Sequence, residues 1–431
     1  METKLARIAE ISKQKPKEIF TSVYHLINKE LLIQCHKELD GKKAKGIDGI
    51  TKAEYQENLE RNIEDLVNKL KNKAFKPCPA KRVYIPKANG KMRGLAIATY
   101  EDKIVQLALK KIVEAIYEPK FLDCMYGFRP NKSCHNVIKA LNHNIEKGKV
   151  SYVIDADIKG FFDNVNHKWL IKCIEQHIKD TNIIRLIKRF LKAGIIENKR
   201  YYGTNEGTPQ GSILSPILAN IYMHYVLTLW FEKKVKANFK GECYITVYAD
   251  DFVCCFQYKG EAEKFMNEIL PQRLEKFGLQ LAKDKTRLIK FGRFAEQDSK
   301  PNKPETFDFL GFTHYCSTSK DGRFRVKRKT SRKKFKAKVK EFDIWLKENK
   351  KLKPKELIPK INTKLRGHFQ YFGITDNYAS INRFVYEVDK LLFKQLNRRS
   401  QRNSYSYETY RKMKETYPLI KPKIYVNVYD I

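Results

Sequence analysis

The sequence lacks the patterns that cross-link a chain or place it in a membrane. Its nine cysteines are scattered and never spaced C-x-x-C, so neither a disulfide framework nor a zinc site is indicated. No run of eighteen apolar residues occurs, and no apolar segment follows the first residues, which argues against a spanning helix and a secretion signal. We therefore expect a cytoplasmic protein with reduced thiols and no membrane partner.

Acidic residues are also scarce. The chain has 86 Lys and Arg against 49 Asp and Glu, which gives a formal net charge of +37 over 431 residues. A charge of this size opposes the compact state by self-repulsion unless a polyanion is the usual partner, and nucleic acid is the first candidate. The length is enough for two to four domains with a sizeable core.

Residues 244–256 contain two runs of β-branched and aromatic residues on either side of Asp250 and Asp251. This pattern is typical of a β-hairpin with carboxylates at its tip. Adjacent carboxylates repel each other, and a cation relieves that repulsion; ligands that are all oxygen suit Mg²⁺ better than Zn²⁺. The alternative is an acidic turn without further function.

A second acidic strand, over residues 151–157, ends in Asp157 and leads through a turn to a helix near Asn166. At the edge of a strand, Asp157 can meet the tip of a neighbouring hairpin. Two metal ions bridged by such carboxylates form the clamp that in-line phosphoryl transfer uses. Phe162 follows five residues later and is either part of this site or a core aromatic residue.

Two further segments suit phosphate. Residues 81–95 predict a hairpin around an Asn-Gly turn, where Lys87 and Arg93 either grip a triphosphate or form a solvated basic edge. Residues 207–216 predict a glycine-containing helix start, which lets the backbone approach a ligand and favours phosphate.

Hydrophobic periodicity predicts most of the helices. It indicates helices over 17–39, 55–70, 101–117, 261–277 and 361–372. The lysine- and arginine-rich run 323–340 predicts an amphipathic helix with a basic outer face. The basic, tyrosine-rich C-terminal segment has a composition that stacks on RNA and neutralises it.

Taken in order, these segments resemble a reverse transcriptase of the group II intron type. Each motif is weak alone, but the ordered set is specific and covers roughly residues 20–425. The matching segments are Gly46–Gly49, Arg82–Lys87, Tyr126–Pro130, Asp157–Asp163, Thr208–Gly211, Leu214–Pro216, Tyr248–Asp251, Phe309–Phe312 and Arg366–Phe372.

This resemblance implies an α+β right-hand polymerase with fingers, an antiparallel-sheet palm and a helical thumb. The expected domains are an N-terminal extension with fingers (1–148), a palm (149–312) with finger helices inserted at about 165–205, a thumb or maturase region (313–395) and a short basic tail (396–431). No cysteine follows Cys316, so a cysteine-paired endonuclease module is not expected. A bacterial source is expected.

The resemblance also implies an activity and its partners. The chain would be an RNA-directed DNA polymerase that extends a DNA or RNA primer with dNTPs on an RNA template. It would also bind its group II intron RNA as a maturase, for splicing and mobility. The cofactor would be two Mg²⁺ ions, which Mn²⁺ could replace, held by Asp157, Asp250, Asp251 and the backbone carbonyl of Ile158.

The remaining roles follow from the resemblance in the same way. Lys285 lies where the family has a candidate proton donor to pyrophosphate, although a surface role is the alternative. Phe162 would exclude a ribose 2′-hydroxyl from the nucleotide site. The dNTP contacts would be Lys87, Arg93, Phe161, Phe162 and Gln210. The template and primer contacts would be Arg129, Phe309, Leu310, Gly311 and Arg366.

The chain departs from the family at Gly94–Thr99, where the family has a glycine and a proline, so the backbone beside the nucleotide site is expected to differ. Two alternative functions stay open: a non-catalytic RNA-binding splicing cofactor and a free-standing defence-type reverse transcriptase. A non-catalytic cofactor has no physical need for three aspartates and an aromatic gate, which favours the enzyme.

Overall fold

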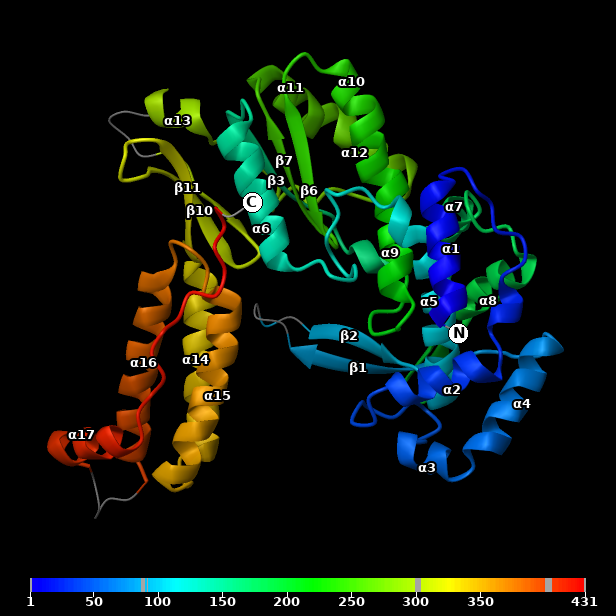
Figure 1. Ribbon diagram of the computed structural model, residues 1–431, viewed down its shortest axis with the longest axis horizontal. Helices are drawn as coiled ribbons and strands as arrows, with labels where there is room; N and C mark the ends of the chain where they lie inside the picture. The colour runs from blue at the N-terminus through cyan, green and yellow to red at the C-terminus, as the bar shows by residue number, and fades with distance from the viewer. Residues whose placement is uncertain (1, 87–89, 91, 299–303, 400–404, 430–431) are drawn as a thin grey trace. The chain divides into compact units, whose positions relative to one another are not determined.

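The computed structural model describes residues 2–86, 90, 92–298, 304–399 and 405–429 (Figure 1). The chain divides into two units, each built from separate segments. The first consists of Met1–Ser133, Ala156–Cys254 and Glu263–Arg287, and the second of Cys134–Asp155, Cys255–Ala262 and Leu288–Ile431. The fingers, palm and thumb boundaries stay a prediction. Within the described ranges, no helix combines the length and the apolar character that crossing a bilayer requires.

Helix α5 (Tyr100–Tyr117) confirms the helix predicted over 101–117 and is largely buried in the first unit. Its side chains Ile104, Val105, Leu109 and Ile112 are fully buried, and it contacts α1, α2 and α9. Thr99 caps it by accepting a hydrogen bond from the Asp102 N–H. The other helices of this unit include α1 (Glu2–Gln14), α2 (Lys29–Glu38), α3 (Lys52–Glu57), α4 (Leu59–Lys71), α7 (His167–Ile174), α8 (Thr181–Lys192), α9 (Ser215–Met223), α10 (Lys236–Asn238) and α12 (Leu270–Lys276).

Two predicted helices are shorter than expected. The helix predicted over 17–39 begins only at Lys29, because Asn28 is extended and caps α2 by accepting from the Leu31 N–H. The helix predicted over 55–70 is two helices, since Asn58 has non-helical backbone angles between α3 and α4. A side-chain cap decides the first boundary and the backbone angles of one asparagine decide the second, and periodicity detects neither.

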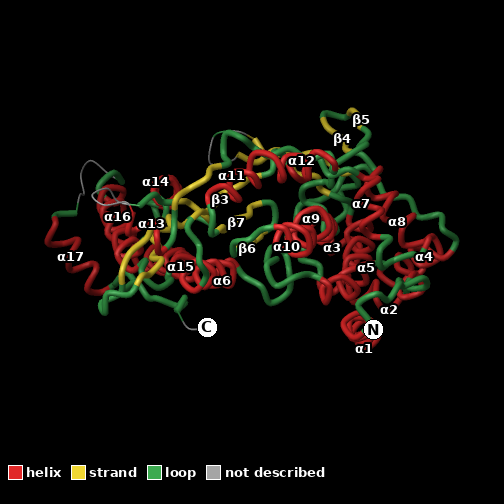
Figure 2. The backbone as a smooth tube through the Cα atoms, turned by 90° about the horizontal axis from the view of Figure 1, so that it is seen from above, coloured by secondary structure: helices red, strands yellow, loops and turns green. Residues whose placement is uncertain are grey.

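The predicted basic hairpin is confirmed. Strands β1 (Ala80–Pro86) and β2 (Met92–Ile97) pair antiparallel, with Ile85 opposite Arg93. The order of this sheet is β2-β1-β4-β5, and Figure 2 shows the short strands β4 (Ile195–Glu197) and β5 (Arg200–Tyr202) side by side. The segment after Arg93, where the chain departs from the family, continues as a regular strand to Ile97.

The acidic residues lie on a four-stranded sheet of order β6-β7-β3-β8. The strands are β3 (Tyr152–Asp157), β6 (Cys243–Tyr248), β7 (Asp251–Phe256) and β8 (Arg287–Lys290). Only Ala249 and Asp250 separate β6 from β7, so the predicted hairpin is a tight one. Ala249 has a φ of +59°, which such a turn requires of a residue at its tip.

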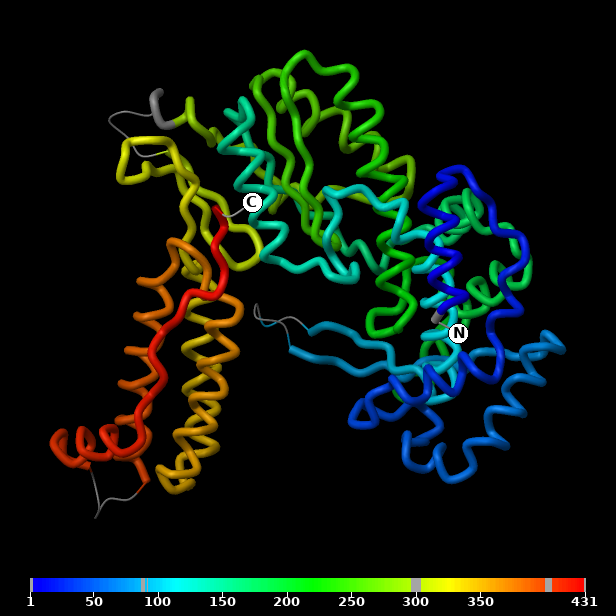
Figure 3. Tube along the Cα trace, in the orientation of Figure 1, coloured from blue at the N-terminus to red at the C-terminus, as the bar shows by residue number. Residues whose placement is uncertain are grey.

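The second unit contains an antiparallel sheet of order β11-β10-β9 and a set of helices. Figures 1 and 3 show three of these helices, α14 (Arg332–Asn349), α15 (Pro354–Phe372) and α16 (Tyr378–Leu396), running side by side. They share one buried core that includes Phe342, Ile361, Phe369 and Phe384. The other elements are α6 (Cys134–Lys147), β9 (Phe307–Phe309), β10 (Phe312–Thr318), β11 (Phe324–Thr330), α13 (Arg293–Asp298) and α17 (Tyr407–Thr416).

The helix predicted over 323–340 was wrong in its first half, which is strand β11. Val326 and Arg328 are both buried there, two residues apart as in a strand. The inward-facing Arg328 is stabilised by a hydrogen bond to the Asn142 Oδ1 (2.6 Å). Helix α14 then begins after Ser331, whose hydroxyl accepts from the Lys334 N–H.

Candidate active site

The acidic hairpin tip is supported from outside its sheet by residues 124–127. The Val247 N–H donates to the carbonyl of Cys124 (2.8 Å), and the Tyr126 N–H donates back to the carbonyl of Val247 (3.0 Å). Asn220 holds the Gly127 carbonyl through its amide (2.8 Å). These bonds place a loop backbone directly beside the turn that carries Asp250.

Gly127 is the closest point of this support. A Cβ atom built on Gly127 would lie 2.2 Å from the Ala249 nitrogen and 2.9 Å from the Ala249 Cα. Only glycine allows two backbones to approach so closely. Gly127 belongs to the Tyr126–Pro130 motif, but nothing in the sequence indicates that its partner lies at residue 249.

Asp157 lies at the end of β3, on backbone that is fixed on both sides. Its carbonyl accepts from the Ala282 N–H (2.8 Å), and the Lys159 N–H donates to the carbonyl of Gln280 (2.8 Å). Ile158 therefore occupies a position without backbone hydrogen bonds in this pairing. Among the described residues its carbonyl oxygen accepts no backbone hydrogen bond, which leaves it available as a ligand.

The charges of the candidate residues act on one another. Burial raises the pKa of Asp250, and the charge of Asp157 raises it further, while Arg93 and Lys285 oppose the shift. Lys285 donates a hydrogen bond to Asp157, and this bond is the largest cause of the raised pKa of the Lys285 ammonium. The charge of Asp251, whose side chain is exposed, also contributes to that shift. Asp157, Lys285 and Arg93 thus act on Asp250, while Asp251 acts on Lys285.

The donor set fits a hard divalent cation. Within the described part of the chain, no three or more His, Cys, Asp or Glu side chains already stand as a metal site. The available donors are carboxylate oxygens and the Ile158 carbonyl, without sulfur or imidazole, which is the set that Mg²⁺ prefers. The raised pKa of Asp250 marks a buried negative charge that a cation would stabilise.

Phe161 and Phe162 are neighbours in the sequence but differ in exposure. Phe161 is 2% exposed, whereas Phe162 is half-buried. The Phe162 ring packs edge-to-face against Phe161 and against Phe128, with centroid distances of 5.4 and 6.3 Å. The Phe162 carbonyl accepts from the Thr208 N–H (2.7 Å), which ties the 207–216 loop to this aromatic group. Phe128 was missed by sequence reasoning as a partner of Phe162.

The loop carrying Gln210 is fixed to strand β2. The Ala96 N–H donates to the Gln210 carbonyl (2.7 Å). The next residue, Gly211, has a φ of +106°, and a Cβ atom built on it would lie only 2.9 Å from the Ala96 carbonyl oxygen. Arg93 is exposed on the same strand. Lys87, the other predicted phosphate contact, lies outside the described residues.

Arg129 does not have the free guanidinium that a template or primer contact needs. Its Nε donates to both carboxylate oxygens of Glu118 (3.0 and 3.2 Å), and its Nη1 donates to the carbonyls of Leu122 and Met125 (2.8 Å each). Its Nη2 pairs with Glu118 at 2.9 Å. With its side chain 6% exposed, Arg129 stabilises the backbone of residues 118–129, and its role as a template or primer contact stays a prediction that these bonds do not support.

The remaining predicted contacts belong to the second unit. Phe309 is 3% exposed and packs in its core, so only the turn at Leu310 and Gly311 is accessible. The Leu310 carbonyl accepts from the Tyr371 hydroxyl (2.9 Å), and both turn residues have positive φ. Arg366 is exposed on α15.

Two family models match successive regions of the chain. A family model described as reverse transcriptase (RNA-dependent DNA polymerase) matches residues 85–314, and one described as group II intron, maturase-specific domain matches residues 332–416. The first region contains the three aspartates and Lys285. The second contains helices α14, α15 and α16.

Individual relatives share these regions. The group II intron-encoded protein LtrA of Lactococcus lactis is 40% identical over 234 residues, which are 54% of this chain and 39% of LtrA. Protein YkfC of Escherichia coli K12 is 30% identical over 315 residues, 66% of this chain and 80% of YkfC. An uncharacterized 91 kDa protein in the cob intron of Schizosaccharomyces pombe is 41% identical over 179 residues, 42% of this chain and 22% of that protein.

Proposed function

The chain belongs to the reverse transcriptase (RNA-dependent DNA polymerase) family and carries a group II intron maturase-specific domain, and on this premise we propose that it extends a primer with dNTPs on an RNA template. The observation that carries the proposal is that Asp157 and Asp250 influence each other's charge. Arg93 and Lys285 lower the pKa of Asp250, which Asp157 raises, and Lys285 is hydrogen-bonded to Asp157. Two half-buried carboxylates whose like charges repel each other are costly without a cation, and in-line phosphoryl transfer uses metal ions held by such groups.

In this proposal Asp157, Asp250 and Asp251, with the Ile158 carbonyl, hold the divalent ions. Two bound Mg²⁺ ions would favour ionisation of the primer 3′-hydroxyl and neutralise charge on the triphosphate. The 3′-oxygen then forms a bond to the α-phosphorus as the bond to pyrophosphate breaks. Lys285, which donates a hydrogen bond to Asp157, would give a proton to the departing pyrophosphate.

Other residues of the first unit position the nucleotide. Arg93 and Lys87 would bind the triphosphate. Phe162, held by Phe161 and Phe128, would lie under the sugar and exclude a 2′-hydroxyl. Gln210 would contact the nucleotide and the template from a loop whose backbone is fixed to β2.

The experiment that tests the activity is primer extension. With a DNA or RNA primer annealed to an RNA template, dNTPs and Mg²⁺, the wild type is expected to give full-length product, and rNTPs are expected to give little. Chelation of the divalent ions should stop extension, because the carboxylates alone cannot stabilise the transition-state charge. Absence of any extension with Mg²⁺ or Mn²⁺ would overturn the proposal.

We also propose that the second unit binds structured RNA of the group II intron type through helix α14. Support comes from the maturase-specific domain and from the outer face of α14, where Lys333, Lys336 and Lys340 are exposed. These three lysines have no acidic partner among the described residues. Such a face neutralises phosphates and releases their counterions.

Replacing Lys333, Lys336 and Lys340 with glutamine is expected to weaken binding of a group II intron RNA. The slope of log affinity against log salt should become shallower by about 2 to 3, since each lost phosphate contact removes a little under one unit. A filter-binding titration at several salt concentrations measures this slope.

The matched control removes the same charge from the first unit, at the exposed Lys233, Lys234 and Lys264. If both triple variants change the slope equally, the effect is one of net charge, and α14 is not the RNA surface. Primer extension on a short template is expected to persist in both, because none of the six lysines belongs to the active site.

A further inference from the structure

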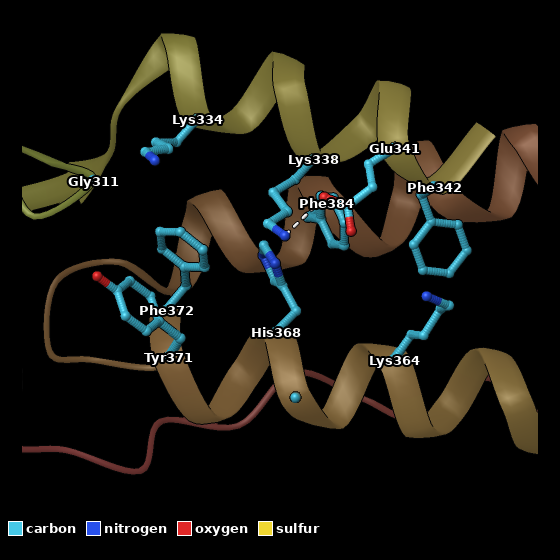
Figure 4. Close-up of a pocket in the computed structure, with 11 residues that line it drawn as sticks. Gly311, Lys334, Lys338, Glu341, Phe342, Lys364, His368, Tyr371, Phe372 and Phe384 are labelled. Carbon is cyan, nitrogen blue, oxygen red and sulfur yellow. Dashed lines mark hydrogen bonds and ion pairs between the residues drawn. The ribbon is translucent and has the colours of Figure 1, made fainter. Parts of the chain in front are cut away.

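The second unit contains a cavity of about 410 Å³ between α14, α15 and α16. Figure 4 shows Lys334 and Lys338 reaching toward it from α14 and Lys364 and His368 from α15, with Phe384 behind them. A volume in this range suits a small ligand or one nucleotide. Gly311, a predicted template or primer contact, lines one end of this space, and no role assigned above uses Lys334, Lys338, His368 or Phe384.

The inner wall of the cavity is aromatic and carries one unsatisfied polar atom. His368 stacks on Phe384 with a centroid distance of 3.8 Å and contacts Phe372 at 4.7 Å. His368 is 9% exposed, and its buried Nε2 has no hydrogen-bond partner among the described residues. Burial, together with the Lys338 charge, lowers the pKa of His368 to about 4, so the ring is neutral at pH 7. A buried polar atom without a partner is costly, and a ligand edge would satisfy it.

The rim of the cavity is positively charged. Lys338 bonds to Glu341 (2.8 Å), and Lys364 lies over the Trp345 ring at 4.9 Å. Lys334 has no acidic partner among the described residues. Three cations against one carboxylate leave a net positive rim, which favours an anionic group beside an aromatic one.

We propose that this cavity accepts one unstacked nucleobase of the bound RNA, with its edge hydrogen-bonded to His368 and its phosphate held by Lys334 and Lys338. The inference rests on the RNA-binding role proposed for this unit and is independent of polymerase chemistry. RNA recognition commonly uses bases splayed onto aromatic side chains beside cations. Because every base has a π-face, the proposal assigns no base identity.

Gly367 offers a way to fill the cavity without disturbing the fold. It lines the cavity, and a Cβ built on it would meet no atom within 4 Å. Gly367→Phe therefore places a ring in the cavity mouth, whereas Gly367→Ala adds only a methyl group. Both replace a glycine inside helix α15, so both are expected to keep or raise the unfolding temperature.

The probe is a pair of eight-nucleotide single-stranded RNAs, one of oligoadenylate and one with the same backbone and abasic central positions. The measured quantity is the ratio of their affinities in fluorescence anisotropy. Wild type and Gly367→Ala are expected to share one ratio, and Gly367→Phe is expected to lower it about tenfold, the usual contribution of one stacked base. His368→Phe, which keeps the ring but removes Nε2, should lower it less.

An unchanged ratio in both Gly367→Phe and His368→Phe would overturn the base-binding proposal. Primer extension by Gly367→Phe should persist. A lower affinity ratio in this variant therefore cannot be attributed to damage at the active site. Failure of the wild type to bind either RNA would instead overturn the RNA-binding role. Titration with AMP distinguishes the source of the base: AMP binding that Gly367→Phe removes, with an unchanged RNA ratio, would overturn RNA as the ligand in favour of a free nucleotide.

Discussion

Asp250→Asn is expected to reduce primer extension at least about a thousandfold, since the charge stabilisation that bound metal ions give the transition state is worth several kcal/mol. The change keeps the shape of the side chain but removes the carboxylate whose pKa the charge of Asp157 raises. It should leave RNA affinity unchanged, because α14 lies in the other unit. Single-turnover extension measures the first quantity, and filter binding the second.

The folded state should tolerate this variant. Asp250 is half-buried, and partial burial and the charge of Asp157 both raise its pKa, so a neutral amide is expected to give an unfolding temperature in metal-free buffer that is no lower than wild type. The matched control is Glu275→Gln, which removes an exposed charge from α12 in the same unit and should extend normally. Undiminished extension by Asp250→Asn would refute the catalytic assignment, and intron-RNA binding without extension in the wild type would favour a splicing cofactor.

The sequence predicts the elements whose signals are local. The Asn-Gly turn predicts the β1–β2 hairpin, and β-branched runs around Asp250 and Asp251 predict the β6–β7 hairpin, because in both cases the turn chemistry and the strand pattern lie within about a dozen residues. Asp157 could be placed at a strand end for the same reason. Its position at a strand edge allowed a meeting with the tip of a neighbouring hairpin, and the resemblance to a known family identified that tip as Asp250 and Asp251.

The sequence is least informative where a distant partner decides the environment of a residue. Arg129 is a cation in a loop, which usually indicates solvent or nucleic acid, yet Glu118 and three backbone carbonyls surround its guanidinium. Residues 324–330 were assigned to a helix because they belong to the lysine- and arginine-rich run 323–340. The buried Arg328 is tolerated in the strand because it pairs with Asp376 (3.7 Å) and donates a hydrogen bond to Asn142. None of these partners can be identified from periodicity.

Gly127 is the position where such a distant contact should matter most. Gly127→Ala is expected to lower primer extension about a hundredfold, the cost of misplacing a reacting group by about 1 Å. The added Cβ, 2.2 Å from the Ala249 nitrogen, must push apart the loop and the turn that carries Asp250. Overpacking of this kind should also lower the free energy of unfolding by about 1–3 kcal/mol. Extension is measured well below the unfolding temperature, so that the folded protein is compared.

Gly260→Ala is the matched control, because a Cβ at that position in α11 (Lys259–Lys264) meets no atom within 4 Å. It should extend like wild type and unfold at an equal or higher temperature. Binding of intron RNA separates a displaced active site from general unfolding: Gly127→Ala should keep wild-type affinity, since the basic face of α14 is not part of this contact. Normal extension by Gly127→Ala would mean that the acidic turn moves without consequence. The position of Asp250 would then not be what limits the reaction.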